Sequence, residues 1–542
     1  MLFSTEFSES ITESQIFRDF ISGNPIFKER FPLNSELFAI EGKLPNIAQS
    51  FTKRDAMLEL LRNSMSCIQP CEIQQKNLKA LEYTNSMVVY TNLSVSFLGG
   101  SIENYLKIFS AVSLVEKLEI VHRNYKFVPI LWVDDSDYVS TETASTATFD
   151  KDYNILNFSL ENDPNKSNFV CSNAVINDSD FEVIQKIADS LSETEYSEQL
   201  KNSIIEFYKQ GTTWANAFIG IINSWFSVRG LLFIKTSSAL KQGVFAHLNN
   251  LELSAPGHSS YILNQSHYQL ELSGYGPFKP GESINLFFHQ DNSKYQISSS
   301  RDNAFYRIND RPQNLKDIVK MNEENASLFS PGHVLMPVYQ NSILPAAAII
   351  ADEREITDLA ASKELFEYCE VNFPCISSRH SITFIDVHTR RFLDKNHLNT
   401  SFFLRDLHEI DEELKRKYYD TGLERQIDHI RERIEYIFEE LNLAAKKLNK
   451  LIEQKTEDAK RAVNHQISEL EIEMQNAQIF KHKDIFDSYN KASNFLYPDS
   501  KLQERVYSPL AFIAKSGIEN FNKTLNGIIS FIPNKHFFIN LT

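Results

Sequence analysis

The sequence has no basic excess, few cysteines and no long hydrophobic run, and each shortage excludes a class of protein. Acidic residues outnumber lysine and arginine by 71 to 55, which gives a formal net charge of -16. Because nucleic acid binds to a basic face, we expect no nucleic acid partner. A nucleotide ligand is compatible with this charge, since it needs only a local basic pocket.

The five cysteines do not fit a secreted disulfide framework. Their number is odd and their spacing is scattered, so we expect reduced thiols at Cys67, Cys71, Cys171, Cys369 and Cys375. No second cysteine or histidine pair follows Cys67 and Cys71 at zinc-binding spacing, and we therefore expect no structural metal site.

The hydrophobic runs are too short to cross a membrane. The longest, residues 343–351, has nine residues, whereas a membrane-spanning helix needs about 20. The opening residues lack the basic and apolar regions of a signal peptide. We therefore expect a cytoplasmic protein that binds small molecules and no membrane.

Two apolar runs separated by an amphipathic helix indicate a βαβ unit. Residues 87–90 and 127–133 are typical of parallel strands buried on both faces, and residues 101–118 are typical of the crossover helix. A third apolar run covers residues 230–234, and further strands are expected at 334–336 and 381–385. We predict an α/β fold with a doubly wound parallel core.

The core is interrupted and then followed by other segments. Short alternating runs at residues 268–272 and 284–288, separated by glycine and proline, indicate a small antiparallel insertion. The predicted order is a first core part with N-terminal helices (1–249), an inserted β-rich segment (250–325), a second core part (326–400), a coiled coil (401–482) and a C-terminal segment that returns to the core (483–542).

A hydrophobic repeat indicates the coiled coil. Aliphatic residues alternate spacings of three and four at Ile427, Ile430, Ile434, Ile437, Leu441, Ala444, Leu448 and Leu451, with charged residues between them. A helix this long cannot bury its seam alone, so it pairs with a neighbouring helix, a second subunit or both. We expect a homodimer formed through the coiled coil, and the alternative is a solvated spacer.

Polar residues follow the predicted strands at the ends where doubly wound sheets bind ligands. The first strand ends in Thr91, Asn92 and Ser94, ahead of a helix whose amino end favours an anion. The second ends in three carboxylates, Asp134, Asp135 and Asp137. Mg²⁺ or a substrate ammonium would relieve their repulsion, and the alternative is a loop of Asx-turns and helix caps.

Two further cations are candidates. Lys107 on the crossover helix can reach a phosphate or lie in solvent, and Arg379 can clamp a carboxylate or form a surface ion pair. Motifs of phosphate loops, dinucleotide sites, nucleophile elbows and zinc proteases are absent. The residues alone therefore indicate a nucleotide- or small-molecule-binding protein whose reaction is unresolved.

The order of segments resembles the cysteine ligase family of bacillithiol biosynthesis. The residues that carry the resemblance are Phe97-Leu98-Gly99-Gly100, Lys107, Val128 to Trp132, Gln340, Glu355, Arg379 with Ser381, and Leu502-Gln503-Glu504-Arg505. The last of these strings resembles the C-terminal signature of the family and is the most specific. The likeness spans about residues 85 to 540.

The resemblance implies a Rossmann-like core and a ligase that adds cysteine to the amino group of glucosaminyl-malate. By analogy ATP, with or without Mg²⁺, activates the carboxylate, because oxide is a poor leaving group and AMP leaves readily. The implied catalytic residues are Asp134, Asp135 and Asp137. The implied substrate- or nucleotide-binding residues are Thr91, Asn92, Ser94, Gly99, Gly100, Lys107, Trp132, Gln340, Glu355 and Arg379.

The chain departs from the family pattern at the strand ends. The Thr-Gly-Gln-Gln turn of the family is Thr91-Asn92-Leu93-Ser94 here, and the histidine of its acidic loop is Ser136. Its Gly-Gly-Pro-Gly-Glu turn is replaced by residues 351–355, which keep only the last glutamate. These losses leave an alternative function, a catalytically degenerate dimeric paralogue that acts as a small-molecule-binding or scaffold protein.

Overall fold

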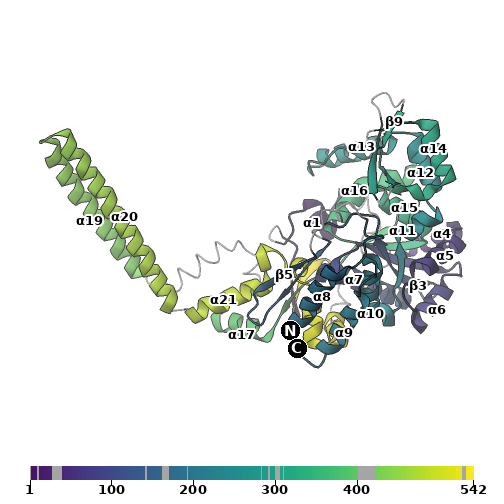
Figure 1. Cartoon of the computed structure of the whole chain (residues 1–542), viewed down its shortest axis with the longest axis horizontal. Helices are drawn as coiled ribbons and strands as arrows, with labels where there is room; N and C mark the ends of the chain where they lie inside the picture. Colours follow the sequence, from purple (N-terminus) through teal and green to yellow (C-terminus); the bar gives the residue numbers. More distant parts are fainter. Residues whose placement is uncertain are drawn as a thin grey trace. The chain divides into compact units, whose positions relative to one another are not determined.

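The structure, a computed structural model, describes residues 2–8, 11–26, 40–140, 143–160, 170–191, 193–281, 284–290, 293–299, 305–308, 311–400, 421–481, 483–527 and 533–541. The chain divides into two compact units (Figure 1). The first unit holds residues 1–384 and 502–542, and the second holds residues 385–501. The chain therefore leaves the first unit and returns to it.

A five-stranded parallel sheet forms the centre of the first unit. Its strands lie in the order β13, β12, β2, β3, β6, and the neighbouring pairs are all parallel. Their bounds are Cys375–Ser378 for β13, Ala346–Ala351 for β12, Ser86–Ser94 for β2, Lys126–Asp134 for β3 and Leu232–Lys235 for β6. The predicted doubly wound core is confirmed.

The winding direction of the sheet reverses between β2 and β12. From β2 the chain adds β3 and then β6 on one side, whereas β12 and β13 lie on the other side of β2. Doubly wound proteins bind their ligands outside the carboxyl ends of the strands at such a reversal. The residues that follow β2, β3 and β12 are therefore the first place to look for a site.

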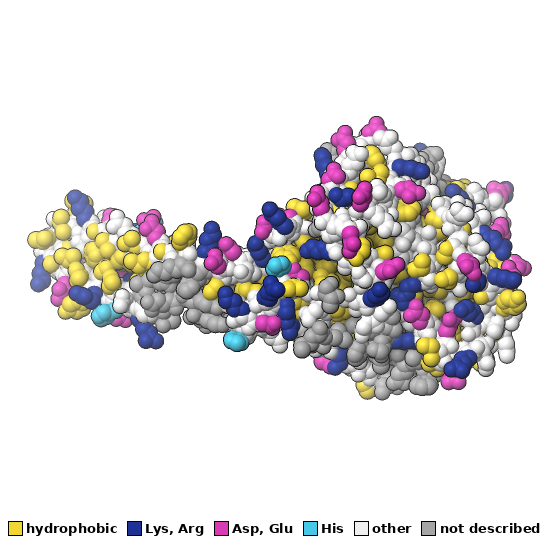
Figure 2. Space-filling view, turned by 90° about the horizontal axis from the view of Figure 1, so that it is seen from below, with side chains coloured by type: hydrophobic (Ala, Val, Ile, Leu, Met, Phe, Trp, Pro, Cys, Tyr) yellow, Lys and Arg dark blue, Asp and Glu magenta, His cyan; other side chains and the backbone are white. Residues whose placement is uncertain are grey.

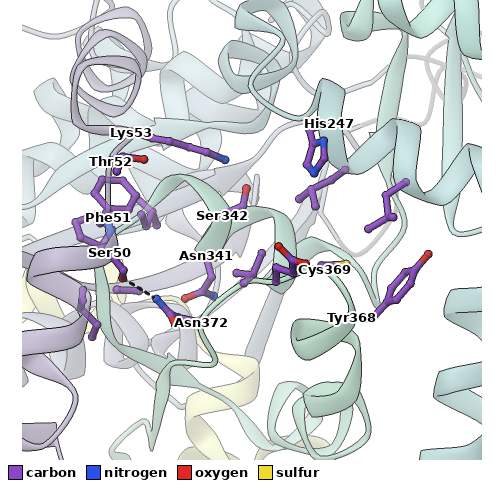
Figure 3. Close-up of a pocket in the computed structure, with 18 residues that line it drawn as sticks. Ser50, Phe51, Thr52, Lys53, His247, Asn341, Ser342, Tyr368, Cys369 and Asn372 are labelled. Atoms are coloured by element: carbon purple, nitrogen blue, oxygen red, sulfur yellow. Dashed lines mark hydrogen bonds between the residues drawn. The ribbon is translucent and has the colours of Figure 1, made fainter.

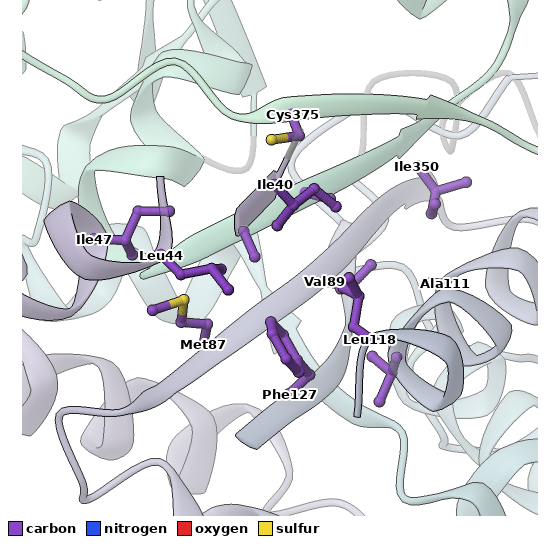
Figure 4. Packing of buried hydrophobic residues seen from close by; sticks show 13 residues of the cluster. Ile40, Leu44, Ile47, Met87, Val89, Ala111, Leu118, Phe127, Ile350 and Cys375 are labelled. Carbon is purple, nitrogen blue, oxygen red and sulfur yellow. The ribbon is translucent and has the colours of Figure 1, made fainter. Parts of the chain in front are cut away.

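Helices cover both faces of the central sheet. On one face Met87, Val89 and Phe127 pack in an apolar cluster with α7 (Ile102–Val121) and α4 (Leu44–Ser50) (Figure 4). Side chains alternate along a strand, so Tyr90 points to the other face. There its hydroxyl accepts a hydrogen bond of 2.5 Å from Asn341 Nδ2 in α15 (Met336–Ile343). Burial on both faces explains why the strands are continuously apolar.

Two segments predicted as strands are not strands, and these predictions were wrong. Residues 268–272 belong to α13 (His258–Leu272), in which the buried Leu263, Ser266 and Leu270 recur at the spacing of a helix face. Residues 334–336 lead into α15, where Pro337 stands in the first turn. Proline is favoured there because the first amide groups of a helix need no intrahelical partner.

An antiparallel sheet lies in the inserted segment. Its strand order is β10, β9, β8, β7, β11. The bounds are Leu286–Gln290 for β7, Ser293–Ser299 for β8, Phe305–Ile308 for β9, Arg311–Asn314 for β10 and Phe329–Pro331 for β11. The start of β8 reaches the acidic loop after β3, because Tyr138 Oη accepts a hydrogen bond of 2.6 Å from Lys294 N.

The C-terminal segment fastens to β14 (Ser381–Ile385). In α22 (Gln503–Val506), Gln503 Oε1 accepts from Phe384 N at 2.7 Å, and Gln503 Nε2 donates to Phe384 O at 3.1 Å. A side chain thus makes the pair of bonds that a neighbouring strand would make. A three-stranded sheet joins both chain ends in the order β1 (Leu2–Glu6), β15 (Lys535–Asn540), β14.

The second unit contains a long antiparallel helical hairpin. Its two arms are α19 (Thr421–Lys446) and α20 (Lys450–Lys481), and shorter helices, α17 (Val387–Asn396) and α21 (Lys483–Leu496), pack on each other. Polar pairs join the arms: Arg431 with Glu471, Lys460 with Glu435, and Asn442 with Glu457. Residues 401–420, the start of the predicted coiled coil, lie outside the described residues.

The predicted seam of the coiled coil splits into two faces. Ile427 and Ala445 are buried, and Ile434 and Phe438 are half-buried. In contrast Ile430, Ile437 and Leu441 are 48%, 49% and 50% exposed and form an outer stripe of α19, and Leu448, which is 72% exposed, follows in the turn after the helix. Hydrophobic side chains are visible on the surface of the hairpin in Figure 2. A single seam was therefore the wrong description.

Among the residues described, none of the helices has the length and apolar character of a membrane span.

Candidate functional site

The carboxyl ends of the central strands lie level with one another. Ser94 pairs with Asp134 across β2 and β3, and Val133 pairs with Lys235 across β3 and β6. The segment after β12 reaches the same edge, because Asp352 shares a partner with Asn92, the amine of Lys107. We call this set of strand ends the carboxyl edge. The structure brings the polar tips of three strands together there.

Asp134 and Asp137 are the outward-facing members of the acidic loop. Asp134 is half-buried, and its Oδ1 accepts hydrogen bonds from Ser136 N at 3.1 Å and Ser136 Oγ at 2.7 Å, which is an Asx-turn. Burial and then the neighbouring Asp137 carboxylate raise the pKa of Asp134. A cation placed between the two carboxylates would reverse that rise.

Asp135 turns inward instead. It is 1% exposed, and its carboxylate accepts from Ser237 N at 2.7 Å and Ser237 Oγ at 2.5 Å, at the start of α11 (Thr236–Gln242). Burial raises the pKa of Asp135 to about 6, although the bonds to Ser237 oppose the rise. In this conformation Asp135 holds α11 against β3 and has no open side toward a substrate.

Three groups beside the acidic loop were not identified from the sequence. Lys294 Nζ lies 2.5 Å from Asp137 Oδ1, and Tyr138 Oη bonds to the backbone of Lys294. His289 Nε2 lies 2.7 Å from Ser330 Oγ, and burial and then Lys294 lower the pKa of His289 to about 4. Because 157 residues separate Lys294 from Asp137, no local pattern could have linked them.

Lys107 lies in a buried ion network. Its Nζ donates to Asn92 O at 2.9 Å and lies 3.2 Å from Asp352 Oδ2 and 2.7 Å from Glu355 Oε2. Asp352 and Glu355 form a capping box at the start of α16 (Glu353–Tyr368). Burial alone would raise the pKa of Asp352, but Lys107 lowers it to about 2, whereas burial and Asp352 raise the pKa of Glu355 to about 7.

The remaining predicted residues of β2 and its turn are mostly structural in this conformation. Thr91 is fully buried and its Oγ1 donates to Ile350 O at 2.9 Å, which ties β2 to β12. Asn92 is half-buried and Ser94 is exposed. Gly99 and Gly100 have φ of 86° and 76°, and a Cβ on Gly99 would lie 2.7 Å from the ring of Trp225. Packing therefore accounts for these glycines.

Trp132, Gln340 and Arg379 are also buried. Trp132 Nε1 donates to Thr236 Oγ1 at 2.9 Å. Gln340 is 0% exposed, and its side-chain nitrogen and oxygen have no hydrogen-bond partner within the described part of the chain. Arg379 lies 2.5 Å from Glu103 and 2.8 Å from Glu504, so in this structure both carboxylates that it clamps belong to the chain itself. The role of Arg379 toward a ligand stays a prediction.

No group of three or more histidine, cysteine or carboxylate side chains that could hold a metal ion is found in the ranges that the structure describes. Asp134 and Asp137 are two carboxyl groups beside a single lysine, Lys294. Such a group can bind an organic ammonium and can accept a proton from it. The carboxyl edge therefore has the chemistry to handle an amine substrate.

Two family models together match almost the whole chain. Residues 4–380 match "Bacillithiol biosynthesis BshC, N-terminal Rossmann-like domain". Residues 382–540 match "Bacillithiol biosynthesis BshC, C-terminal coiled-coil domain". The Rossmann-like match covers the parallel sheet with its insertion, and the coiled-coil match covers the helical hairpin and the returning segment.

Curated relatives cover the chain nearly from end to end at low identity. A protein of Chlorobaculum tepidum is 23% identical over 88% of this chain and 87% of its own length. A protein of Flavobacterium psychrophilum is 24% identical over 94% of each chain. A protein of Staphylococcus saprophyticus is 22% identical over 86% of this chain and 87% of its own length. Each is named "Putative cysteine ligase BshC". Nothing in these comparisons favours the non-catalytic alternative.

Proposed function

The chain belongs to the BshC family of bacillithiol biosynthesis, and we propose that it joins the carboxyl group of cysteine to the amino group of glucosaminyl-malate. The names of its relatives support the ligase class. The observation that carries the proposal is the outward-facing pair Asp134 and Asp137 at the carboxyl edge. An amine arrives as an ammonium, and two carboxylates that share one lysine leave the negative charge that attracts it.

The proposed step for these residues is deprotonation. An ammonium has no lone pair, so the amine must lose a proton before its nitrogen can attack a carbonyl carbon. Asp134 takes this proton, because its raised pKa makes it a better base than an exposed aspartate. The nitrogen then forms the amide bond, and the leaving group departs from the carboxyl carbon with its electron pair. Asp137, which Lys294 holds in position, accepts a hydrogen bond from the amine.

Activation of the carboxylate by ATP, with or without Mg²⁺, is part of the proposal by resemblance. When bound, ATP would supply a leaving group better than oxide. Thr91 and Lys107, the predicted phosphate ligands, do not fit a phosphate in this structure, because Thr91 is bonded to Ile350 O and Lys107 is enclosed by Asp352 and Glu355. We therefore derive no step through the nucleotide.

The test is a direct assay of the purified chain with ATP, cysteine and glucosaminyl-malate. We expect a thiol product with the combined mass of the two substrates less one water, formed at a rate proportional to the enzyme concentration. Replacement of cysteine by serine serves as the control and should give no thiol product. Absence of the product at high enzyme concentration would refute the proposed reaction.

We place this reaction in the cytoplasm, where the five cysteines, free in the structure, stay reduced.

We further propose that the chain is a homodimer, formed through the outer stripe of α19. Ile430, Ile437 and Leu441 are spaced seven and four residues apart, so they lie on one face of α19, and the exposed Leu448 follows in the turn after the helix. Exposed aliphatic stripes of this kind are uncommon on monomers because their burial is favourable. A second copy of the same hairpin offers a matching stripe.

A double substitution of the stripe tests the dimer. Ile437→Glu with Leu441→Glu should convert a dimer to a monomer in light scattering, because four carboxylates per dimer would be buried unpaired. Tyr436→Glu with Leu443→Glu is the matched control, since these residues are 62% and 63% exposed on the same helix but off the stripe. A wild-type chain that scatters as a monomer, or equal masses for both double variants, would contradict the assignment.

A further inference from the structure

A second pocket lies at the amino end of the central sheet, opposite to the carboxyl edge. Its volume is about 470 Å³, within the usual range of small-molecule sites. Its wall comes from the loop between α4 and α5 (Arg54–Ser64), from α12 (Ala246–Ser254), from the end of α15 and from the end of α16 (Figure 3). Ala346, the first residue of β12, also lines it, whereas Asp352 follows the last residue of that strand.

An unsatisfied acceptor lines this pocket. Asn341 is only 7% exposed, and its Nδ2 donates to Tyr90 Oη at 2.5 Å and to Pro337 O at 2.8 Å. Its Oδ1 has no hydrogen-bond partner among the residues that the structure describes, and Asn341 belongs to the lining. This oxygen is not among the buried side-chain atoms that lack a partner, so it is open to the pocket, where a ligand that carries a hydroxyl or a similar donor can bond to it.

The same pocket is lined by two basic side chains, Lys53 and His247. Lys53 Nζ forms no ion pair with any described residue, and desolvation lowers its pKa. Lys53 is also the N-cap residue of α5 and leaves the first amide groups of that helix without a side-chain cap. His247 lines the pocket from α12, and Figure 3 shows it on a different wall from Lys53. Glu370 is the single carboxylate of the lining.

We propose that this pocket binds a small hydroxylated organic anion. Its acid group lies against Lys53, His247 and the amino end of α5, and a hydroxyl donates to Asn341 Oδ1. Hydroxyl groups also suit the last turns of α4, α15 and α16, whose terminal carbonyls lack intrahelical donors. The acid can be a carboxylate or a phosphate. This site differs in charge from the carboxyl edge, which attracts an ammonium.

Calorimetry with the full chain tests the proposal. The probes are glycerol 3-phosphate and D-glycerate, which distinguish a phosphate from a carboxylate. Glycerol, which lacks the acid group, and inorganic phosphate, which lacks the alcohol hydroxyls, are the partial probes. We expect at least one hydroxylated anion to bind more tightly than either partial probe. Lys53→Gln should weaken that binding about tenfold or more, as loss of a charged hydrogen bond does. Lys79→Gln, an exposed lysine on α6 (Glu72–Ala80), is the matched control and should bind as the wild type does.

A labelling experiment assigns the binding to this pocket. Cys369 lines it, and burial raises the pKa of this thiol to about 12, so alkylation under mildly alkaline conditions is slow but measurable by mass spectrometry. The bound probe should slow labelling of Cys369 and leave that of Cys67, outside the lining, unchanged. No binding of either hydroxylated anion at millimolar concentration, equal binding by Lys53→Gln, or unchanged labelling of Cys369 would each overturn the proposal. None of these measurements depends on ligase activity.

Discussion

Replacement of Glu504 by alanine is expected to lower the free energy of unfolding of the first unit by about 3–5 kcal/mol. Glu504 is fully buried, and its carboxylate accepts from Ile382 N at 2.6 Å, Ser381 Oγ at 2.8 Å and Arg379 Nη1 at 2.8 Å. Its removal would leave a buried guanidinium with Glu103 as the remaining carboxylate partner and a backbone amide without an acceptor. The loss is large because both charge and hydrogen bonds are left unpaired.

Urea unfolding followed by tryptophan fluorescence measures this loss. The three tryptophans, Trp132, Trp214 and Trp225, all belong to the first unit, so the signal reports on that unit. Glu504→Gln should cost less, because its carbonyl oxygen can still accept from Ile382 N. The control is Glu519→Ala, an exposed glutamate of the same returning segment, which should change stability by less than about 0.5 kcal/mol. Equal urea midpoints of unfolding for Glu504→Ala and Glu519→Ala would show that the C-terminal signature does not stabilise the first unit.

Replacement of Asp134 by asparagine is expected to reduce kcat/KM for the amine substrate by about 10²–10⁴, the usual contribution of a general base. Asparagine can keep the Asx-turn to Ser136 through its carbonyl oxygen, so the conformation of the loop backbone should not change. The lost function is the acceptance of a proton. In the wild type the rate should rise with pH through the raised pKa of Asp134, because only the ionised carboxylate is a base.

The matched control for this variant is Asp150→Asn. Asp150 also forms an Asx-turn, in which its Oδ1 accepts from Asp152 N at 2.8 Å and Asn154 N at 2.9 Å, but it stands in the turn between β4 (Ser145–Phe149) and β5 (Ile155–Ser159). Its substitution should leave the rate and the pH profile unchanged. If Asp134→Asn retains both the wild-type rate and the wild-type rise with pH, Asp134 is not the base.

Candidate side chains at strand ends could be predicted from the sequence, whereas their partners from distant segments could not. The position at the end of a buried strand predicted Asn92, Ser94 and Asp134 as candidates, because strand ends can be recognised from the residues themselves. The partners of those side chains could not be predicted. Asp352 meets Lys107 across 245 residues, and Lys294 meets Asp137 across 157. Ion pairs between distant segments leave no periodic pattern in either segment.

The amino-acid sequence by itself determined the parallel core and the long helices of this protein. A strand buried on both faces must be apolar throughout, as residues 87–90 and 127–133 are, and a long helix must repeat its apolar residues every three or four positions. Periodicity is a local property, so it can be recognised without knowledge of the partner.

Only the tertiary structure decided which faces and charges meet. The repeat in α19 did not show that Ile434 faces α20 while Leu441 faces outward, since both belong to one apolar pattern. Nor did the residues show that Asp135 is enclosed by Ser237 while Asp134 is accessible. These outcomes depend on how distant segments pack, because burial and a neighbouring charge, not residue type, set whether a carboxylate holds the fold or binds a substrate.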